Sequence, residues 1–365
     1  MKIPIFDPKR HYKLLEREFL VATKKVLSSG RLVLGEETRQ LEKEFARFCG
    51  TKYAAMVNSG TSALLATLLA YEIGSGDEVI TVPNSFAATA QVIYFSGAKP
   101  VFVDIDPTTY NIDPKKIEKA ITKSTKAIIV VHLYGHLAEM EKIKKIARKH
   151  KLLIIEDAAQ AQGAKYKNKS AGNLGNAGCF SFFVTKNLPS FGTSGIVTTN
   201  NKTVAEKIKI LRDNGMVEKG KHILSLNFMP EELQAAFLRI KLKHLKNWNT
   251  RRRRIANYYS KHLSGLPFVL PREEKGVYHV YYQFVIRTKN RDKLQAYLEN
   301  KGVQTRVYYP VPIHLQPGFK YLGYKRGSFP KTEAAAKEIL SLPMYPELTD
   351  KEVETVIKQV KAFFN

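Results

Sequence analysis

The sequence predicts an α/β protein with a large domain built on a mostly parallel sheet and a smaller C-terminal α+β domain. From about residue 54, short β-branched runs alternate with helical patterns, which is typical of a parallel sheet covered by helices on both faces. The runs are continuously apolar, and this indicates strands buried on both faces. The character of the chain changes after about residue 247. We therefore place the two domains at residues 1–247 and 248–365.

Seven segments of the large domain are predicted to be buried strands, and helical patterns separate most of them. In chain order they are AAMVNSG, DEVITVP, KPVFVDI, KAIIVVHLYG, KLLIIEDAA, GCFSFFVT and GIVTTN. In the smaller domain a long basic helix comes first, and the run 281–286 has strand character. A Pro-rich loop and a last helix follow, which completes the α+β pattern.

The composition excludes several classes of protein. Of the residues, 44% are hydrophobic and 25% are charged, as in a folded soluble chain. The first residues carry a proline and charges where a signal peptide needs an apolar segment, and no later run has the length of a membrane span. Cys49 and Cys179 are the only cysteines, so we expect no disulfide framework. We predict a cytoplasmic protein without a membrane partner.

The formal net charge is +26, from 59 Lys and Arg against 33 Asp and Glu. A charge of this size suits nucleic acid, an acidic membrane surface or an anionic small substrate, and does not choose among them. The densest run, Arg251 to Arg254, lies among apolar residues at helical spacing. A solvated helix face is therefore favoured over a nucleic-acid site, and we expect no nucleic-acid partner.

Candidate functional groups follow the predicted strands, because ligands of an open parallel sheet bind beyond the carboxyl ends of its strands. The stretch NSGTS places a glycine turn before a helix, with Gly60, Thr61 and Ser62 at the helix start. Unpaired N–H groups and the helix dipole at such a start suit a phosphate. Ser and Thr are also ordinary helix caps, so the residues alone leave both roles open.

Two charged residues follow other strands. Asp157 ends the run LLIIED at the edge of a buried sheet, where a carboxylate needs a cationic partner unless it caps a helix. Lys186 follows the run FFVT. A half-buried amine there is available as a nucleophile towards a carbonyl, whereas a surface lysine would extend into water.

The helix start, the acid and the lysine have more force together than singly. Pyridoxal 5′-phosphate needs a lysine that forms a Schiff base, a carboxylate that keeps the pyridine nitrogen protonated, and an anchor for its phosphate. We therefore predict pyridoxal 5′-phosphate as the cofactor, with Lys186 and Asp157 as catalytic residues, and we expect no metal.

Ordered motifs run through nearly the whole chain. They are LGEETRQLEKEFARFCGTKYAAMVNSGTSAL, GSGDEVITVPNSFAATA, GAKPVFVDID, VVHLYGH, IEDAAQAQGA, CFSFFVTKNL, LRDNG, LNFMPEELQAA, PVPIHLQPGF and ILSLPMYPELT. On these motifs the chain resembles the DegT/DnrJ/StrS family of nucleotide-sugar aminotransferases. The resemblance implies the aspartate aminotransferase fold (PLP fold type I), with a large cofactor-binding domain and a small C-terminal domain.

The resemblance also implies individual roles. Lys186 forms the Schiff base and then moves the proton between the cofactor and the sugar carbon. Asp157 pairs with the pyridine nitrogen, Gln160 pairs with the phenolic oxygen, and Phe86 lies against the ring. The phosphate is held by Gly60, Thr61, Ser62 and Ser181, together with Asn227 from the neighbouring subunit. The protein is therefore expected to be a homodimer with shared active sites.

The implied reaction is a ping-pong transamination, in which glutamate leaves its amino group on the cofactor and a nucleotide-linked keto-sugar collects it. The paired prolines of the run 309–316 resemble members that act at carbon 3, often on dTDP-3-keto-6-deoxyhexoses. Amination at carbon 4 of a UDP-, dTDP- or GDP-linked sugar is the alternative. Tyr308, Tyr309 and His314 are the expected substrate-binding residues. The product would be an amino sugar for polysaccharide, lipopolysaccharide or glycoside biosynthesis.

Three positions depart from the family's usual pattern: Thr193 lies where Gly-Glu-Gly-Gly is common, Met229 where an arginine is usual, and Tyr308 where a histidine is usual. The last two concern donor anchoring and sugar identity. These departures and the charge motivate an alternative of another class, a regulatory or nucleic-acid-binding protein on the same fold. An amino-acid aminotransferase is disfavoured, because Arg306 is the only nearby candidate for binding a substrate carboxylate.

Overall fold

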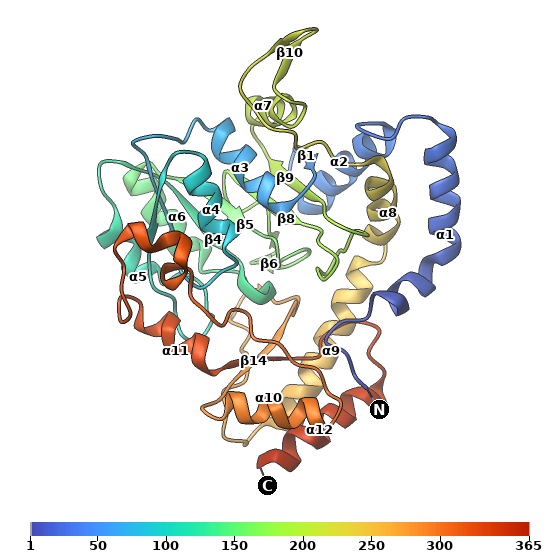
Figure 1. Cartoon of the computed structure of the whole chain (residues 1–365), viewed down its shortest axis with the longest axis vertical. Coiled ribbons are helices and arrows are strands. Elements are labelled where there is room, and N and C mark those ends of the chain that lie inside the picture. The colour runs from blue at the N-terminus through green and yellow to red at the C-terminus, as the bar shows by residue number, and fades with distance from the viewer. Residues whose placement is uncertain (1, 365) are drawn as a thin grey trace.

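The structure, a computed structural model that describes residues 2–364, confirms the predicted α/β class (Figure 1). A central sheet lies between layers of helices in the upper part of the molecule. A smaller group of helices with a two-stranded sheet lies below it, and both ends of the described chain lie in this lower part.

The main sheet of the described chain has seven strands in the order β1-β9-β8-β5-β4-β2-β3. Strand β9 is antiparallel to both of its neighbours, whereas the other adjacent pairs are parallel. The expectation of a mostly parallel sheet is therefore confirmed. The strands are β1 (Tyr53–Val57), β2 (Glu78–Thr81), β3 (Lys99–Phe102), β4 (Thr125–Val131), β5 (Leu153–Asp157), β8 (Ala177–Ser181) and β9 (Gly195–Thr199).

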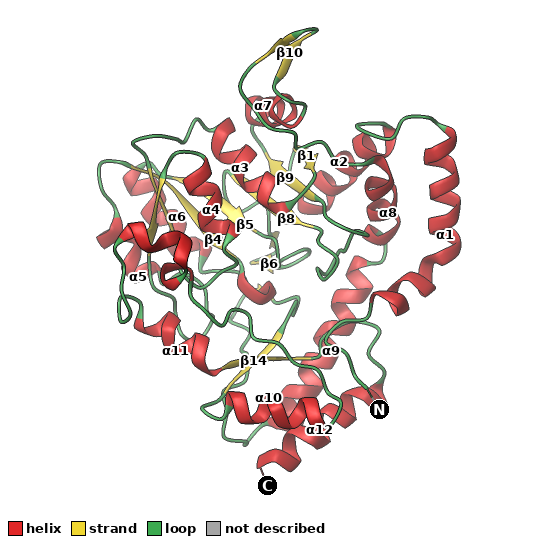
Figure 2. Cartoon of the chain, in the orientation of Figure 1, coloured by secondary structure: helices red, strands yellow, loops and turns green. Residues whose placement is uncertain are grey.

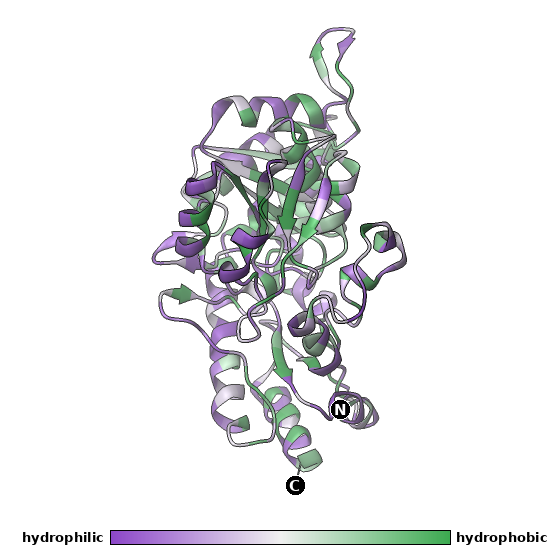
Figure 3. Cartoon of the chain, turned by 90° about the vertical axis from the view of Figure 1, so that its left-hand side faces the viewer, coloured by the Kyte–Doolittle hydropathy of each residue, from purple (hydrophilic) through white to green (hydrophobic). Residues whose placement is uncertain are grey.

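Helices cover both faces of this sheet (Figure 2). Successive side chains of a strand point to opposite faces, so Ile128 and Ile129 of β4 belong to different cores. Figure 3 shows the hydrophobic strands inside the upper part. The face of Ile129 packs against α3 (Gly60–Ala70), α4 (Ala88–Phe95) and α7 (Lys202–Arg212). The face of Ile128 packs against α2 (Glu36–Cys49), α6 (Met140–His150) and α8 (Glu232–Leu242).

Further elements lie outside this sandwich. Helix α1 packs against α8, and the hairpin β10–β11 projects beyond the body next to α7 (Figure 1). Short strands β6, β7 and β12 form a small sheet that joins the two parts of the molecule. The bounds are α1 (Pro8–Ser28), α5 (Pro114–Ile117), β6 (Lys165–Tyr166), β7 (Lys169–Ser170), β10 (Met216–Glu218), β11 (Lys221–His222) and β12 (Val277–Tyr278).

The C-terminal part has its own core, in which β13 and β14 pair antiparallel. Ile3, at the opposite end of the sequence, is fully buried in this core and pairs with Val303. The first residues therefore pack with the C-terminal part, although the predicted boundary at 247 assigns them to the large domain. The elements are α9 (Leu245–Leu263), β13 (Phe284–Arg287), α10 (Arg291–Asn300), α11 (Pro330–Glu338), β14 (Ile339–Leu342) and α12 (Asp350–Phe364).

One predicted strand ends earlier than expected. The run GCFSFFVT forms a strand only as far as Ser181, so Lys186 does not directly follow a strand. Phe182 donates its N–H to Ser194 and accepts from Ser190, and Lys186 donates its N–H to the carbonyl of Phe183. These contacts turn the chain into a folded loop, which overrides the strand propensity of the phenylalanines.

None of the helices within residues 2–364 combines the length and the apolar character that crossing a bilayer would require.

A buried carboxylate joins α8 to the start of α2. Glu232 is buried and accepts the N–H groups of Gly35 and Thr38 at 2.6 and 3.0 Å and the Thr38 hydroxyl at 2.7 Å. The two N–H groups are among the donors that a helix start leaves without intrahelical partners. The contact fixes the position of α8. This position matters because residues of α8 contact the loop that follows Lys186.

Glu232→Ala should lower the free energy of unfolding by about 3 kcal/mol, because three buried donors lose a charged acceptor. Glu231→Ala changes an exposed neighbour and should change it by less than about 0.5 kcal/mol. Urea denaturation of both variants measures the difference, and equal effects would contradict this role of Glu232.

Candidate active site

A cavity of about 410 Å³ lies at the carboxyl ends of the parallel strands. It brings together residues that are far apart in sequence, from both parts of the chain. The predicted residues that line it are Gly60, Thr61, Phe86, Asp157, Gln160, Ser181, Lys186, Tyr308 and Tyr309. Thr193, one of the departures from the family pattern, also lines it.

Asp157 ends β5 and is only 6% exposed. Its carboxylate accepts the Thr89 hydroxyl at 2.7 Å and the Ala159 N–H at 3.2 Å. Within residues 2–364 it has no ion-pair partner inside 4.0 Å, although the charge of Lys186 acts on it from farther away. Burial raises the pKa of Asp157, and the hydrogen bonds oppose that rise. A buried carboxylate without an ion-pair partner would be stabilised by a ligand that places a cationic N–H group in the cavity.

The start of α3 forms another wall. Ser59 caps the helix by accepting the N–H of Ser62 at 3.0 Å, and the Ser62 hydroxyl donates to Asn58 at 2.6 Å. Ser62 is therefore engaged in the cap. Gly60 and Thr61 line the cavity, and no intrahelical carbonyl can accept their N–H groups.

Of the two roles that the sequence left open, the capping role is carried by Ser59 and Ser62, and the N–H groups of Gly60 and Thr61 keep no intrahelical acceptor. The close approach of strand β8 explains the glycine, because a Cβ at Gly60 would lie 2.6 Å from the Ser181 Cβ.

Lys186 extends its amine over the ring of Tyr282, with Nζ 4.5 Å from the ring centroid. The Tyr282 hydroxyl shares a hydrogen bond of 3.1 Å with Thr185. Burial acts to raise the pKa of Tyr282, but the charge of Lys186 and the hydrogen bonds from Thr185, Gln283 and Lys186 together lower it. Sequence reasoning missed Tyr282, which lines the cavity. Its position within the strand-like run 281–286 was the available signal.

Gln160 is held from two sides. Its Oε1 accepts the Tyr134 N–H at 2.7 Å, and its Nε2 donates to the Tyr309 hydroxyl at 3.2 Å. Tyr309 in turn lies 6.0 Å, centroid to centroid, from the ring of Phe86. Burial raises the pKa of Tyr308 to about 12, so this phenol stays neutral at physiological pH.

Three predicted residues do not line the cavity: Ser62, which is engaged in the helix cap, Asn227 and His314. Asn227 is exposed and accepts the Met229 N–H at 3.0 Å, next to the base of the projecting hairpin. His314 is buried, and its Nε2 lies 3.1 Å from Glu333. The imidazole of His314 is therefore committed to a contact within the C-terminal part.

The donor set of the cavity fits pyridoxal 5′-phosphate. A buried carboxylate suits a protonated ring nitrogen, a lysine suits a carbonyl carbon, and free N–H groups at a helix start suit a phosphate. The volume of about 410 Å³ lies within the range of roughly 300–1,000 Å³ that small-molecule sites occupy. The cofactor that the resemblance implies is consistent with these residues.

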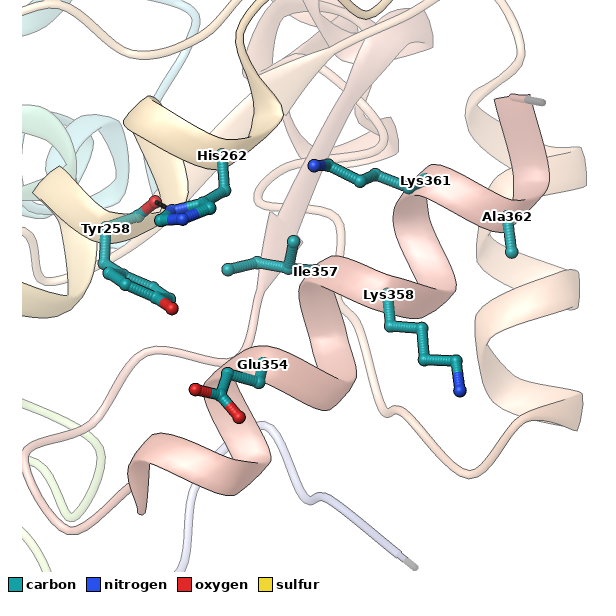
Figure 4. A pocket seen from close by; sticks show the side chains of 7 residues that line it. All are labelled: Tyr258, His262, Glu354, Ile357, Lys358, Lys361 and Ala362. Carbon is teal, nitrogen blue, oxygen red and sulfur yellow. Dashed lines mark hydrogen bonds between the residues drawn. The ribbon is translucent and has the colours of Figure 1, made fainter.

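A second hollow, of about 460 Å³, lies between α9 and α12 (Figure 4). Tyr258 and His262 face Glu354, Ile357 and Lys358 across it. It lies in the C-terminal part, away from the strand ends, and it is wide open to solvent. The chemistry of the lysine, the acid and the helix start belongs to the first cavity.

Comparisons with known proteins concern the chain as a whole. The model of the DegT/DnrJ/EryC1/StrS aminotransferase family matches residues 13–361. The chain is 46% identical to a pleiotropic regulatory protein of Geobacillus stearothermophilus, covering 100% of this chain and 99% of the relative. It is 43% identical to the dTDP-3-amino-3,6-dideoxy-alpha-D-galactopyranose transaminase of Aneurinibacillus thermoaerophilus, covering 99% of each chain.

Among solved structures, DesV of S. venezuelae in complex with a ketimine intermediate has a TM-score of 0.97. It is 40% identical, and the match covers 100% of this chain and 99% of that one.

Asp157→Asn should raise the melting temperature of the cofactor-free protein at pH 7. The folded state binds the Asp157 proton more tightly than the unfolded state, so ionisation destabilises the fold as pH rises above the ordinary pKa of 3.8. The gain in melting temperature should shrink as the pH falls towards 3.8, because Asp157 then becomes protonated in the folded and the unfolded states alike. Thermal unfolding at pH 7 and pH 4 measures it, and a lower melting temperature of the variant at pH 7 would contradict the burial argument.

Proposed function

Because this chain belongs to the DegT/DnrJ/EryC1/StrS aminotransferase family and is a pyridoxal-phosphate-dependent transaminase, we propose that it aminates carbon 3 of a nucleotide-linked keto-sugar. The best candidate substrate is a dTDP-3-keto-6-deoxyhexose, with glutamate as amino donor. The observation that carries the proposal is the single cavity in which Lys186, Asp157 and the start of α3 meet.

When bound, the cofactor supplies a ring that withdraws electrons from the carbon that gains or loses the amino group. We propose that Lys186 bonds to the cofactor through Nζ and moves a proton at that atom during turnover. The ring of Tyr282 lies under Nζ and restricts its direction. The Thr185 hydroxyl holds Tyr282 in turn.

The proposed role of Asp157 is to keep a proton on the pyridine nitrogen. Thr89 and Ala159 orient its carboxylate for this role, and its burial excludes water that would weaken the pairing. Gln160 would donate to the phenolic oxygen, since the Tyr134 N–H fixes its amide. Phe86, which lines the cavity, would contact the face of the pyridine ring.

We assign the phosphate to Gly60, Thr61 and Ser181, all of which line the cavity. The first two would contribute N–H groups at the positive end of a helix, and the last a hydroxyl. Ser62, whose hydroxyl is used within the cap, would support the helix start indirectly.

On the substrate side, Tyr308 and Tyr309 line the cavity and are proposed to contact the sugar. The Tyr134 hydroxyl donates to the carbonyl of Tyr308 and holds this segment. His314 would act only through the packing of its loop. Carbon 3 is supported by the name of the Aneurinibacillus thermoaerophilus relative. The net charge of +26 does not oppose an anionic nucleotide-diphosphate substrate.

The active unit is proposed to be a homodimer in which Asn227 reaches the phosphate site of the partner. Residues 223–226, close to Asn227, are largely apolar and project into solvent, with Leu224 99% exposed. Helix α1 also exposes Leu14, Leu20 and Val21. Apolar surface of this extent is typical of an interface, and a two-fold dimer would cover both regions.

Lys186→Ala should abolish the visible absorption of the bound cofactor and lower turnover roughly a thousandfold or more, because the bond to the cofactor is lost. Wild type should bleach with glutamate and recover its band with a 3-keto-sugar nucleotide. Lys167→Ala, at an exposed lysine, is the control. Recovery of the band only with 4-keto substrates would contradict amination at carbon 3. Normal turnover by Lys186→Ala would contradict the catalytic role of Lys186.

The shared site can be tested with hybrid dimers of Lys186→Ala and Asn227→Asp. Asn227→Asp alone should weaken cofactor affinity about tenfold through charge repulsion with the phosphate. If Asn227 serves the partner's site, each hybrid dimer has one intact site. Random mixing makes about half of the dimers hybrid, so at a pyridoxal phosphate concentration too low to fill the Asn227→Asp sites the mixture should recover about a quarter of wild-type activity. No recovery on mixing would mean that Asn227 acts within its own chain.

A further inference from the structure

Lys241, in the last turn of α8, is fully buried with 0% exposure. Among the described residues its amine has no ion-pair partner, and the negative charge of Glu347 acts on it only from a distance. The charge of Lys241 also acts on the buried His11, which is paired with Glu347 at 2.7 Å. Burial lowers the pKa of Lys241 to about 7. A lysine in this state lowers the stability of the fold.

The contacts of the amine are specific. Nζ donates to the carbonyl oxygen of Pro189 at 2.8 Å and lies over the ring of Phe191, 3.7 Å from its centroid. The ring of Phe19 in α1 lies 5.3 Å away. Phe19, Phe191 and Phe237 pack edge to face, with centroids 4.9 to 5.4 Å apart. The amine therefore lies among aromatic rings, which favour a cation electrostatically.

These groups are on one face of α8, because Gln234, Phe237 and Lys241 are three and four residues apart. Gln234 accepts the Phe191 N–H at 2.8 Å and donates back to the Phe191 carbonyl at 3.3 Å. Together with Lys241 it holds the backbone from Pro189 to Phe191. This segment begins three residues after Lys186.

The opposite side of the same loop is also fixed. Asn187 donates to Asn249 at 2.8 Å and to the carbonyl of Val280 at 3.1 Å, and Ser190 donates to Phe182. Pro189 itself has no N–H, so its carbonyl is the main-chain group by which this part of the loop can be held. Among these anchors, Lys241 is the one whose buried amine lowers the stability of the fold.

We infer that Lys241 is a positioning residue: by holding the Pro189 carbonyl from behind, it sets where the loop presents Lys186 in the cavity. This inference rests on the proposed role of Lys186. An apolar residue of similar length would fill the same space at a lower cost in stability. A buried group that lowers stability beside a catalytic loop is the pattern expected where function requires a fixed geometry.

Lys241→Met separates this role from a structural one. We expect the variant to be at least as stable to heat as wild type at pH 7, because a buried amine is removed. We expect the apoprotein to capture pyridoxal phosphate about tenfold more slowly, followed by growth of the visible band in stopped flow. The kcat of the holoenzyme should fall about tenfold, with KM values within about twofold, since Lys186 is displaced while the substrate groups are unchanged.

Two further variants complete the experiment. Lys243→Met, at an exposed lysine two residues on, should behave as wild type. Lys241→Arg keeps a donor and a cation and should recover part of the capture rate. Wild-type capture by Lys241→Met would overturn the inference. The inference would also be overturned if Lys241→Met lost stability in parallel with its capture rate and Lys241→Arg recovered neither. The role of the lysine would then be purely structural.

A wrong assignment of the substrate would give a different experimental result. Wild type would then capture the cofactor but would not pass the amino group to any keto-sugar nucleotide. The comparison of capture rates would still decide the role of Lys241.

Discussion

The buried carboxylate of Asp157 is the constraint on which the site depends. It lies at the end of a fully covered strand, where water cannot solvate its charge. Thr89 and Ala159 satisfy it only in part. The carboxylate therefore suits a cationic ring nitrogen, and the start of α3 and Lys186 line the same cavity. In the proposed function, stability and cofactor binding are coupled through this one side chain.

The loop that carries Lys186 is held by tertiary contacts rather than by regular structure. Strand β8 ends five residues earlier, and the loop is then anchored by α8 on one side and by Asn249 and Val280 on the other. Glu232 ties α8 to the start of α2. A chain of buried polar contacts thus connects the catalytic loop to the helical layer, which keeps the geometry of Lys186 fixed.

The C-terminal part contributes more than a cover over the cavity. Tyr282, Tyr308 and Tyr309 enter the site from it, and the first residues of the chain pack into its core through Ile3. The residues proposed to bind the cofactor come from the large sheet, whereas these phenols come from the smaller part. This division is consistent with the proposed cofactor contacts on the sheet side and substrate contacts on the side of the smaller part.

The sequence by itself determined two local features: an apolar strand that ends at Asp157, and a glycine turn at Gly60 that opens a helix. Both are present in the folded chain, because they depend on neighbouring residues alone. Tertiary structure decided the rest. It ended β8 early, turned His314 towards Glu333, brought Tyr282 under Lys186 and buried Lys241 among rings from α1 and the loop. Composition predicts a solvated lysine at such a position, and only contacts between residues distant in sequence can reverse that expectation.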